Sequence, residues 1–290
     1  MSGVFLWLPN PRLDASLLSV LILAATPIGN IGDASPRLRK TLGEATAIAC
    51  EDTRVLRQLC SALEIELGAK LYSLHEHNER DKLTQLLRIA QEQDLVLVSD
   101  AGMPTISDPG YILVREAAAA GIEVSIIPGP SAVLSALAIS GLPTDSFSFL
   151  GFLPRKSGER RAMFENHRLD RQTLAFFESP HRIHDALVDA LEVLGAREAA
   201  VARELTKKFE EVARGRLDEL VAWSETQPKG ELVLLIAGAQ AEELDYPTLA
   251  AKALLLTERG MSLKDASTTI SELVGGSKKE IYDHALRLRA

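Results

Sequence analysis

Five short stretches of the chain are richer in polar residues than plain turns require, and three of them also contain both glycine and proline. The longest, residues 99–110, reads SDAGMPTISDPG and holds two glycines and two prolines. Such residues fix an unusual backbone path and keep side-chain bulk away from a docking molecule. A small ligand bound close to the backbone is therefore predicted at residues 25–30 (ATPIGN), 51–54 (EDTR), 75–79 (HEHNE), 99–110 and 128–132 (PGPSA).

Each of these stretches follows a segment of strand length, such as the apolar run LVLV at residues 95–98. Strands that are buried on both faces of a parallel sheet show this pattern. Because ligands bind at the carboxyl ends of the strands in such sheets, the five stretches are expected to line one crevice. We expect strands at 20–25, 47–50, 70–73, 95–98 and 124–127, separated by helices at 36–45, 54–63, 83–91, 111–120 and 131–139.

A domain boundary is predicted at residues 140–143 (SGLP), where glycine and proline end a helix. Beyond it we expect a smaller domain with a mixed sheet, with strands at 147–150, 173–177, 199–202, 211–213 and 232–236 and helices at 160–168, 183–194 and 217–225. Three short helices at 247–257, 263–273 and 278–288 then resemble a helix-turn-helix. Contact with nucleic acid and simple packing explain these last helices equally well.

The predicted fold class is therefore α/β with a helical appendage. We expect an N-terminal extension at 1–19, an α/β domain with a parallel sheet at 20–140, an α/β domain with a mixed sheet at 141–240 and helices at 241–290.

The composition is that of a folded, acidic protein. The chain has 290 residues, a net charge of −8 and 46% hydrophobic residues, which argues against disorder and suits two domains. Cys50 and Cys60 have neither metal-site nor disulfide spacing, so we expect two core thiols in a reducing cytoplasm. The apolar residues 4–8 are cut off by Pro9, which predicts neither a signal peptide nor a membrane span.

Several common ligand motifs are missing from the sequence. There is no G-x-G-x-x-G after the first strand, no G-x-x-x-x-G-K-[ST] and no G-x-S-x-G, so dinucleotide, P-loop and nucleophile-elbow chemistry are not indicated. His75 and His77 flank a glutamate, but without a third ligand at a fixed spacing we expect no metal. His181 precedes a predicted helix, and at that position contact with phosphate or substrate is a more natural role than metal binding.

Basic residues gather in the second half although the whole chain is acidic. Between residues 155 and 171, Lys and Arg outnumber Asp and Glu, and Arg182, Arg203, Lys207 and Lys208 add to them if the domain folds them to one side. A solvated surface is the plain explanation. In an acidic protein, however, a basic stripe confined to one domain favours the approach of a polyanion.

Ten strings occur here in an order typical of one family: ATPIGN, CEDTR, HEHNER, SDAGMPTISDPGY, PGPSA, SGLPTDSF, GFLPRK, FESPHRI, ARELTKKFEE and KGELVLLI. With them the chain, from residue 21 to about residue 238, resembles the ribosomal RNA small subunit methyltransferase I group of the tetrapyrrole methylase superfamily. The resemblance implies two α/β domains with S-adenosylmethionine held in the cleft between them, followed by a helical C-terminal region.

This resemblance also implies site residues. It assigns cofactor contacts to Pro27, Gly29, Asp100, Ala101, Gly102, Met103, Ile106, Ser131 and Ala132 of the first domain and to Phe177 and Gly230 of the second. Asp100 and Asp108 could favour the cationic cofactor electrostatically or tie down their loop. The group methylates a ribose 2′-hydroxyl of a cytidine in the decoding region of 16S rRNA, a step that a general base would assist. The candidates for that base, all expected on loops facing the cleft, are His75, His77, Glu79 and Glu178.

The partners implied by the resemblance are 16S rRNA within the small ribosomal subunit and a second copy of the chain, in the cytoplasm. Phosphate contacts are expected from the basic stripe, at Arg155, Lys156, His181, Arg182, Arg203 and Lys207. Two alternatives remain open: methylation of a flat acidic tetrapyrrole on the same fold, and a non-catalytic RNA-binding factor that acts in ribosome assembly.

Overall fold

The computed structural model describes residues 19–75, 77–240, 245–274 and 276–289. The predicted N-terminal extension, apart from Ser19, lies outside the described residues. The chain divides into two compact units, one ending at Ala239 and the other beginning at Gln240. No helix in the described ranges is both long and apolar enough to cross a membrane.

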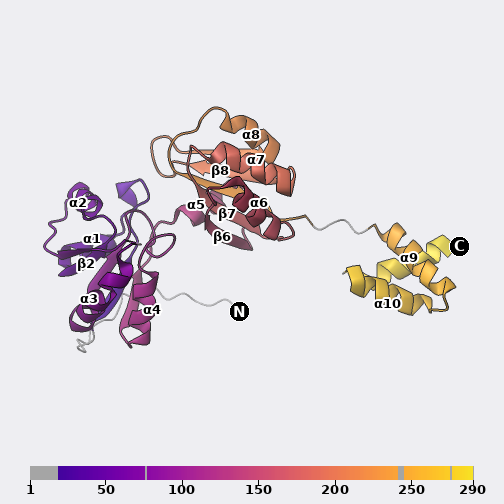
Figure 1. The fold of residues 1–290 in the computed structure, drawn as a ribbon, viewed down its shortest axis with the longest axis horizontal. Coiled ribbons are helices and arrows are strands. Elements are labelled where there is room, and N and C mark those ends of the chain that lie inside the picture. Colours follow the sequence, from indigo (N-terminus) through magenta and orange to yellow (C-terminus); the bar gives the residue numbers. More distant parts are fainter. Residues whose placement is uncertain (1–18, 76, 241–244, 275, 290) are drawn as a thin grey trace. The chain divides into compact units, whose positions relative to one another are not determined.

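The first sheet of the larger unit is entirely parallel, as predicted (Figure 1). Its strand order is β3-β2-β4-β1-β5, so β1 and β4 are neighbours near the centre and β5 is an edge. The strands are β1 (Val20–Ala24), β2 (Ala47–Cys50), β3 (Lys70–Ser73), β4 (Leu95–Val98) and β5 (Glu123–Ile127). The helices that follow them are α1 (Pro36–Glu44), α2 (Thr53–Ala62), α3 (Glu79–Glu92), α4 (Tyr111–Ala119) and α5 (Ala132–Ser140), with a 3₁₀ turn η1 (Ile31–Asp33) before α1.

Capping and charged residues explain where helices α1 and α3 begin. The Ser35 hydroxyl accepts a hydrogen bond from the Leu38 amide (3.1 Å) and Pro36 occupies the first position of α1, both of which favour a helix start. α3 begins at Glu79, four residues before the predicted position. The periodicity gave no sign of this turn because its residues 79–82 are all charged. Acidic residues in a first turn nevertheless stabilise a helix through its dipole.

The second sheet is mixed, as predicted. In the order β6-β7-β10-β8-β9, β6 pairs with β7 in parallel and the other pairs are antiparallel. The strands are β6 (Phe147–Phe152), β7 (Thr173–Glu178), β8 (Glu198–Arg203), β9 (Glu211–Arg216) and β10 (Leu232–Ile236), and the helices are α6 (Ser157–Asn166), α7 (Ile183–Leu194) and α8 (Leu217–Ser224).

The two faces of this second sheet have different neighbours. One face carries Leu174 and Phe176 into a core with Phe164 of α6 and Leu187 of α7. The other face, with Ala175, Val233 and Leu235 among its members, packs on Val133, Ala136 and Leu137 of α5 and on Ile28. Helix α5 therefore joins the two sheets into one compact unit and places the loops after β1 and β4 beside the second sheet.

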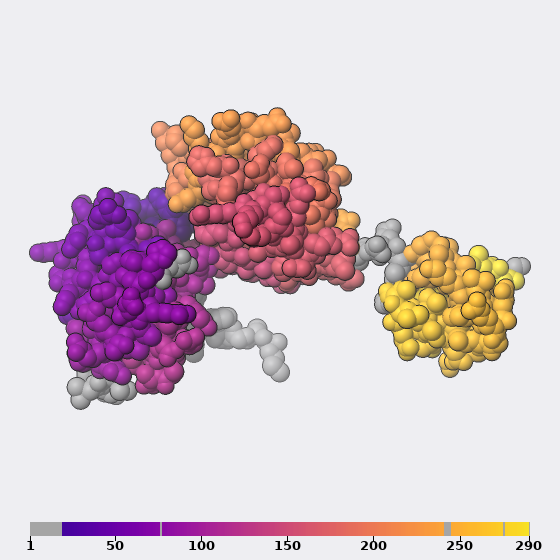
Figure 2. Space-filling view, viewed as in Figure 1, coloured from indigo at the N-terminus to yellow at the C-terminus, as the bar shows by residue number. Residues whose placement is uncertain are grey.

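The smaller unit is a bundle of α9 (Tyr246–Glu258), α10 (Leu263–Val274) and α11 (Lys278–Arg289), the three helices that the sequence predicted. Its core contains Leu249, Ala253, Ala266, Ile270 and Ile281. The space-filling view shows residues 246–289 as a compact body of their own (Figure 2).

Candidate functional site

The loop between β4 and α4 is fixed to the loop after β1. The Thr26 amide donates to the Gly102 carbonyl (2.9 Å) and the Gly102 amide donates back to the Thr26 carbonyl (3.1 Å). The Ser99 hydroxyl also donates to the Gly102 carbonyl at 3.2 Å. These bonds make the central loop a rigid floor rather than a mobile connection.

The path of this loop requires unusual backbone angles. Gly102 has a φ of +80°, and a β-carbon there would lie 3.2 Å from Cγ2 of Ile28. Thr105 and Ser107 also adopt left-handed angles, with φ of 74° and 62°. Non-glycine residues pay an energetic penalty in this region, and such strain clusters at functional sites.

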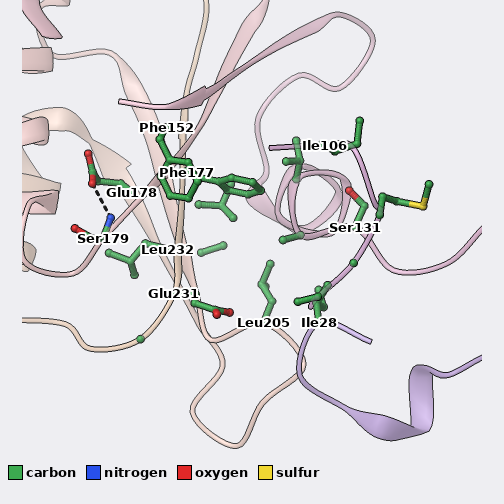
Figure 3. A pocket seen from close by; sticks show the side chains of 18 of the residues that line it. Ile28, Ile106, Ser131, Phe152, Phe177, Glu178, Ser179, Leu205, Glu231 and Leu232 are labelled. Carbon is green, nitrogen blue, oxygen red and sulfur yellow. Dashed lines mark hydrogen bonds between the residues drawn. The ribbon is translucent and has the colours of Figure 1, made fainter. Parts of the chain in front are cut away.

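A crevice of about 330 Å³ opens between this floor and the second sheet (Figure 3). We call it the central crevice. Its size and mostly apolar lining are typical of a small-molecule site. The first half of the unit contributes Ile28, Ala101, Gly102, Met103, Ile106, Asp108, Ser131, Ala132 and Val133, and the second half contributes Phe152, Phe177, Glu178, Ser179, Pro180, Ala202, Leu205, Gly230, Glu231, Leu232 and Val233.

Aromatic rings form one wall of the central crevice. The centroids of Phe152 and Phe177 lie 5.3 Å apart with their planes tilted by 55°, and Phe149 packs edge-on against Phe177 at 4.9 Å. Figure 3 shows the rings of Phe152 and Phe177 side by side at the crevice. Such a wall suits a flat ring of a ligand.

The opposite rim is fixed by an ion-pair network. Lys207 Nζ lies 3.0 Å from Glu204 Oε1 and 2.9 Å from Glu231 Oε2, and the Glu231 amide donates to Glu204 Oε1 at 3.1 Å. Gly230 has a φ of +96°, and a β-carbon there would overlap the Glu204 carboxylate. Glycine is therefore needed where the backbone passes this network.

Most of the predicted cofactor residues line the central crevice. They are Ala101, Gly102, Met103, Ile106, Ser131, Ala132, Phe177 and Gly230. Pro27, Gly29 and Asp100 are not among the lining residues. Pro27 is buried, a β-carbon at Gly29 would lie 2.5 Å from Cγ of Lys207, and Asp100 Oδ1 accepts a hydrogen bond from the Asp52 amide at 3.0 Å. These three residues support the crevice from behind.

Glu178 contributes to the crevice lining, but its carboxylate points elsewhere. Residues alternate along β7, so Glu178 shares the face of Phe176, opposite to Phe177. Its Oε1 lies 2.6 Å from Arg182 Nη2 and accepts a hydrogen bond from the Ser179 amide at 2.6 Å. Figure 3 shows the carboxylate turned away from the side chains across the crevice. Burial raises the pKa of Glu178, and the Ser179 amide and Arg182 oppose this.

Glu79 lies in a helix and not in the predicted loop. It is buried, and its Oε1 accepts hydrogen bonds from the amides of Gly110 (3.1 Å), Ile112 (2.9 Å) and Leu113 (3.3 Å). The amides at the start of α4 have no side-chain cap from their own segment, so Glu79 of α3 supplies one. This engagement leaves Glu79 as a structural tie between the two helices.

His75 and His77 are exposed, and His77 lines a second cavity. This second cavity, of about 660 Å³, lies between the N-terminal ends of α3 and α4, and we call it the α3–α4 cavity. It is lined by His77, Glu79, Arg80, Asp81, Asp108, Pro109, Tyr111 and Ile112. No group of three or more side chains within the described ranges could hold a metal ion.

Asp108 lines both the central crevice and the α3–α4 cavity. Burial, together with the nearby charges of Glu51 and Asp100, raises its pKa to about 6, and the Ser99 hydroxyl partly offsets this. The sequence offered Asp108 only as an electrostatic or loop-fixing residue. Its position between two cavities could not be read from spacing, because it depends on where α3 packs.

The predicted phosphate contacts have mixed surroundings. Lys156 pairs with Glu159 (3.1 Å), Arg182 with Glu178, Arg203 with Glu211 and Lys207 with Glu204. Arg155 and His181 are exposed, with no side-chain partner in the described part of the chain. The neighbouring Arg160 is buried against Asp189 at 2.5 Å. Much of the basic stripe is therefore neutralised from within.

The chain is similar to known methyltransferases along most of its length. A family model described as Tetrapyrrole (Corrin/Porphyrin) Methylases matches residues 20–221. The chain is 45% identical over 272 residues to Ribosomal RNA small subunit methyltransferase I of Mycobacterium tuberculosis (strain CDC 1551 / Oshkosh), with 93% of this chain and 95% of that protein covered. It is 43% identical over 271 residues to the Escherichia coli O157:H7 protein of the same name, with 92% and 94% covered.

Solved structures show the same fold at lower identity. The methyltransferase CobJ matches with a TM-score of 0.58 and 23% identity, over 77% of this chain and 95% of that one. Uroporphyrin-III C-methyl transferase from Thermus thermophilus, complexed with S-adenyl homocysteine, matches with a TM-score of 0.51 and 21% identity, over 75% and 96%.

Proposed function

This chain belongs to the tetrapyrrole methylase family and, within it, to the ribosomal RNA small subunit methyltransferase I family, and from that premise we propose that it methylates small-subunit ribosomal RNA with S-adenosylmethionine as the donor. The observation that carries this proposal is identity of 43–45% along nearly the whole chain with proteins of that name. Uroporphyrin-III C-methyl transferase shares the fold at only 21% identity, so the higher identity to the ribosomal RNA enzymes favours the RNA substrate over a tetrapyrrole.

The central crevice fits such a donor. Its volume of about 330 Å³ suits a nucleoside-sized molecule, and the Phe152–Phe177 wall offers an apolar surface for the adenine. The loop at Gly102 lets the donor approach the backbone. We assign the donor contacts to Ala101, Gly102, Met103, Ile106, Ser131, Ala132, Phe177 and Gly230, with Pro27, Gly29 and Asp100 holding the loops behind them.

The proposed acceptor is the ribose 2′-hydroxyl of a cytidine in the decoding region of 16S rRNA. When bound, the donor supplies an activated methyl group on a sulfonium, and the transfer is an in-line displacement. The chain's part is to hold the ribose oxygen opposite the sulfur, which can lower the barrier by about 7–11 kcal/mol. A base that takes the hydroxyl proton would add roughly 10²- to 10⁴-fold.

Among the four base candidates from the sequence, His77 has the best position. It lies beside the α3–α4 cavity, whereas Glu79 is engaged with α4 and Glu178 with Arg182. His75 is exposed and lies outside the linings of both cavities. We therefore retain His77 and drop the two glutamates from the proposed reaction.

The experiment that tests this function is methyl transfer to purified small subunits that lack the modification. Donor with a labelled methyl group should place about one label per subunit on a cytidine ribose, located by nuclease digestion and mass spectrometry. Naked 16S rRNA in parallel shows whether the assembled subunit is required. Label that appears in a porphyrinoid instead of RNA, or tight subunit binding without any label, would refute the assignment.

We propose Arg155 and His181 as the main phosphate contacts, because neither has a side-chain partner in the described part of the chain. Secondary contacts are proposed for residues that are already paired with carboxylates: Lys156, Arg182, Arg203 and Lys207. Replacing Arg155 with Gln should weaken subunit binding and reduce its dependence on salt concentration. An unchanged salt slope would remove Arg155 from the interface.

We also propose a homodimer working in the cytoplasm, where subunits are assembled. Its support is the edge strand β5, whose Val124 and Ile126 are 36% and 46% exposed. Exposed apolar residues on an unpaired edge favour association. Light scattering after chromatography should give twice the chain mass for the wild type and less for Ile126→Lys.

A further inference from the structure

The central crevice and the α3–α4 cavity have Asp108 as a common lining residue. The two cavities therefore approach each other at this residue. Methyl transfer needs two molecules, a donor and an acceptor, whose reacting atoms lie about 3–3.5 Å apart. Two cavities that meet at a carboxylate provide such an arrangement.

The walls of the α3–α4 cavity are held in place before any ligand arrives. Glu79 joins the start of α3 to the first turn of α4 through three amide hydrogen bonds. Figure 1 shows α3 and α4 side by side, in agreement with their contacts. Gly110, which supplies one of these amides, packs so closely that a β-carbon would lie 2.7 Å from Leu97 Cδ2.

An exposed aromatic ring stands at this cavity. Tyr111, the first residue of α4, lines it and is 63% exposed. A ring this exposed at the edge of a cavity is accessible to a flat ligand. Unpaired bases of RNA stack on such rings, and a base unstacked from its neighbours presents its ribose to the protein.

We propose that the α3–α4 cavity receives the nucleotide whose ribose is methylated, that Tyr111 stacks on its base and that Asp108 takes the proton of the 2′-hydroxyl. This inference rests on the proposed function and names the acceptor site that the function requires.

The proposed methyl transfer forms one bond, breaks one bond and moves one proton. The 2′-oxygen forms a bond to the methyl carbon while the carbon–sulfur bond of the donor breaks, and its electron pair stays on sulfur. The hydroxyl proton passes to Asp108 and leaves afterwards to solvent. The sulfonium becomes a neutral thioether and the RNA gains one methyl ether.

Asp108 suits this role better than an ordinary aspartate. Burial is the main cause of its raised pKa; the charges of Glu51 and Asp100 raise the pKa further, and the hydrogen bond with Ser99 lowers it. His77, Glu79, Arg80 and Asp81 line the same cavity. A base whose pKa, about 6 here, lies close to the working pH is ionised and still holds a proton well. His77 then becomes a neighbour of the nucleotide rather than the base.

The second half of the chain offers a rival aromatic site. Phe209 is also 63% exposed and lines a separate cavity with Trp223 and Lys229. That cavity does not include Asp108 or the central loop, although Gly230 belongs to both it and the central crevice. Phe209 is therefore a matched control for Tyr111, with equal exposure and a ring of similar size.

The stacking contact is tested on small subunits that lack the modification. Tyr111→Ala should raise KM for the subunits about 10- to 100-fold and leave the calorimetric affinity for S-adenosylmethionine unchanged. Tyr111→Phe should restore KM, because stacking needs the ring and not the hydroxyl. Phe209→Ala should behave as wild type. Loss of subunit binding in Phe209→Ala with normal Tyr111→Ala would overturn the assignment of the cavity.

The proton acceptor is tested by the pH profile of single-turnover methylation. The wild-type rate should rise through about pH 6 as Asp108 ionises. Asp108→Asn should slow the step about 10²- to 10⁴-fold, keep donor affinity and lose this limb. Asp81→Asn, which removes a carboxylate from the α3–α4 cavity alone, should keep the limb. A limb that persists in Asp108→Asn would exclude Asp108 as the base.

Failure of this inference can be told apart from failure of the function. If the wild type places no label on small-subunit RNA, the function itself is wrong and the acceptor site falls with it. If the wild type labels the RNA but the Tyr111 and Asp108 variants match it, the function stands and only the acceptor site is refuted.

Discussion

Glu79 offers a quantitative test of how the site is built. Its Oε1 accepts three hydrogen bonds from the start of α4, at 2.9 to 3.3 Å, from a buried position. Glu79→Ala would leave these amides without their acceptor. Each hydrogen bond to a charged group contributes about 1.5–3 kcal/mol, but water entering the vacated space would recover part of this. We expect a loss of about 2–4 kcal/mol in the free energy of unfolding of the larger unit.

The measurement combines urea unfolding with amide hydrogen exchange. The amides of Gly110, Ile112 and Leu113 should exchange faster in Glu79→Ala than in the wild type, because opening of the first turn of α4 becomes easier. Glu79→Gln keeps an acceptor oxygen and loses only the charge. It should cost about 1 kcal/mol and leave these amides largely protected.

A matched control lies at the other end of the same helix. Glu92 is exposed and makes only a 3.8 Å ion pair with Arg88, so Glu92→Ala should change stability by less than about 0.5 kcal/mol. If Glu79→Ala costs no more than Glu92→Ala, or if Gln and Ala at residue 79 are equally harmful, the capping explanation is wrong.

Three further predictions concern buried charge, pH and backbone strain. Arg160→Met should cost about 1.5–3 kcal/mol in urea unfolding, because it removes the buried partner of Asp189 Oδ2, while Arg161 and Ser157 still bind Oδ1 of the same carboxylate. Asp108 has a pKa near 6 in the folded state, above its ordinary 3.8, so its stabilising contribution is present below pH 3.8 and is lost as pH rises through 6. Asp108→Asn should therefore be about 1–2 kcal/mol more stable than wild type at pH 8 and not at pH 4; equal urea midpoints at pH 8 would contradict this. Gly102→Val places a branched side chain at φ +80° against Ile28, and calorimetry should show loss of S-adenosylmethionine binding by a protein that still folds; normal binding would refute the assignment of the floor.

The sequence predicted the sheet architecture well because the strands are short apolar runs flanked by glycine and proline. The bounds of β2, β3, β4, β10 and α7 match the predictions at both ends. The predicted bounds of α6 and β9 each differ from the structure by up to three residues, and for α3 and β6 the reason is a lack of side-chain periodicity. The first turn of α3 is entirely charged, and β6 continues through Gly151 to Phe152, so neither showed the pattern of its element.

The roles of the acidic residues were harder to predict from the sequence than the sheets. Glu79 and Glu178 were expected on loops facing the cleft, and this made them candidates for the general base. Their partners, the amides of α4 and Arg182, come from packing and strand alternation, which local spacing does not reveal. The position of Asp108 between two cavities also depends on packing, because elements distant in the sequence enclose it.

An acidic protein that acts on RNA must obtain its affinity from somewhere other than net charge. The chain carries −8 overall, and four of its six predicted phosphate contacts already have carboxylate partners. An ion pair has to open or be shared before its cation can neutralise a phosphate. Arg155 alone would give a salt slope of only about −0.7 on a single strand. On the acceptor site proposed above, stacking on Tyr111 and a close fit to the folded subunit would then supply most of the specificity. A base and a sugar would enter the cavity, and the phosphates would need no contact with its carboxylates.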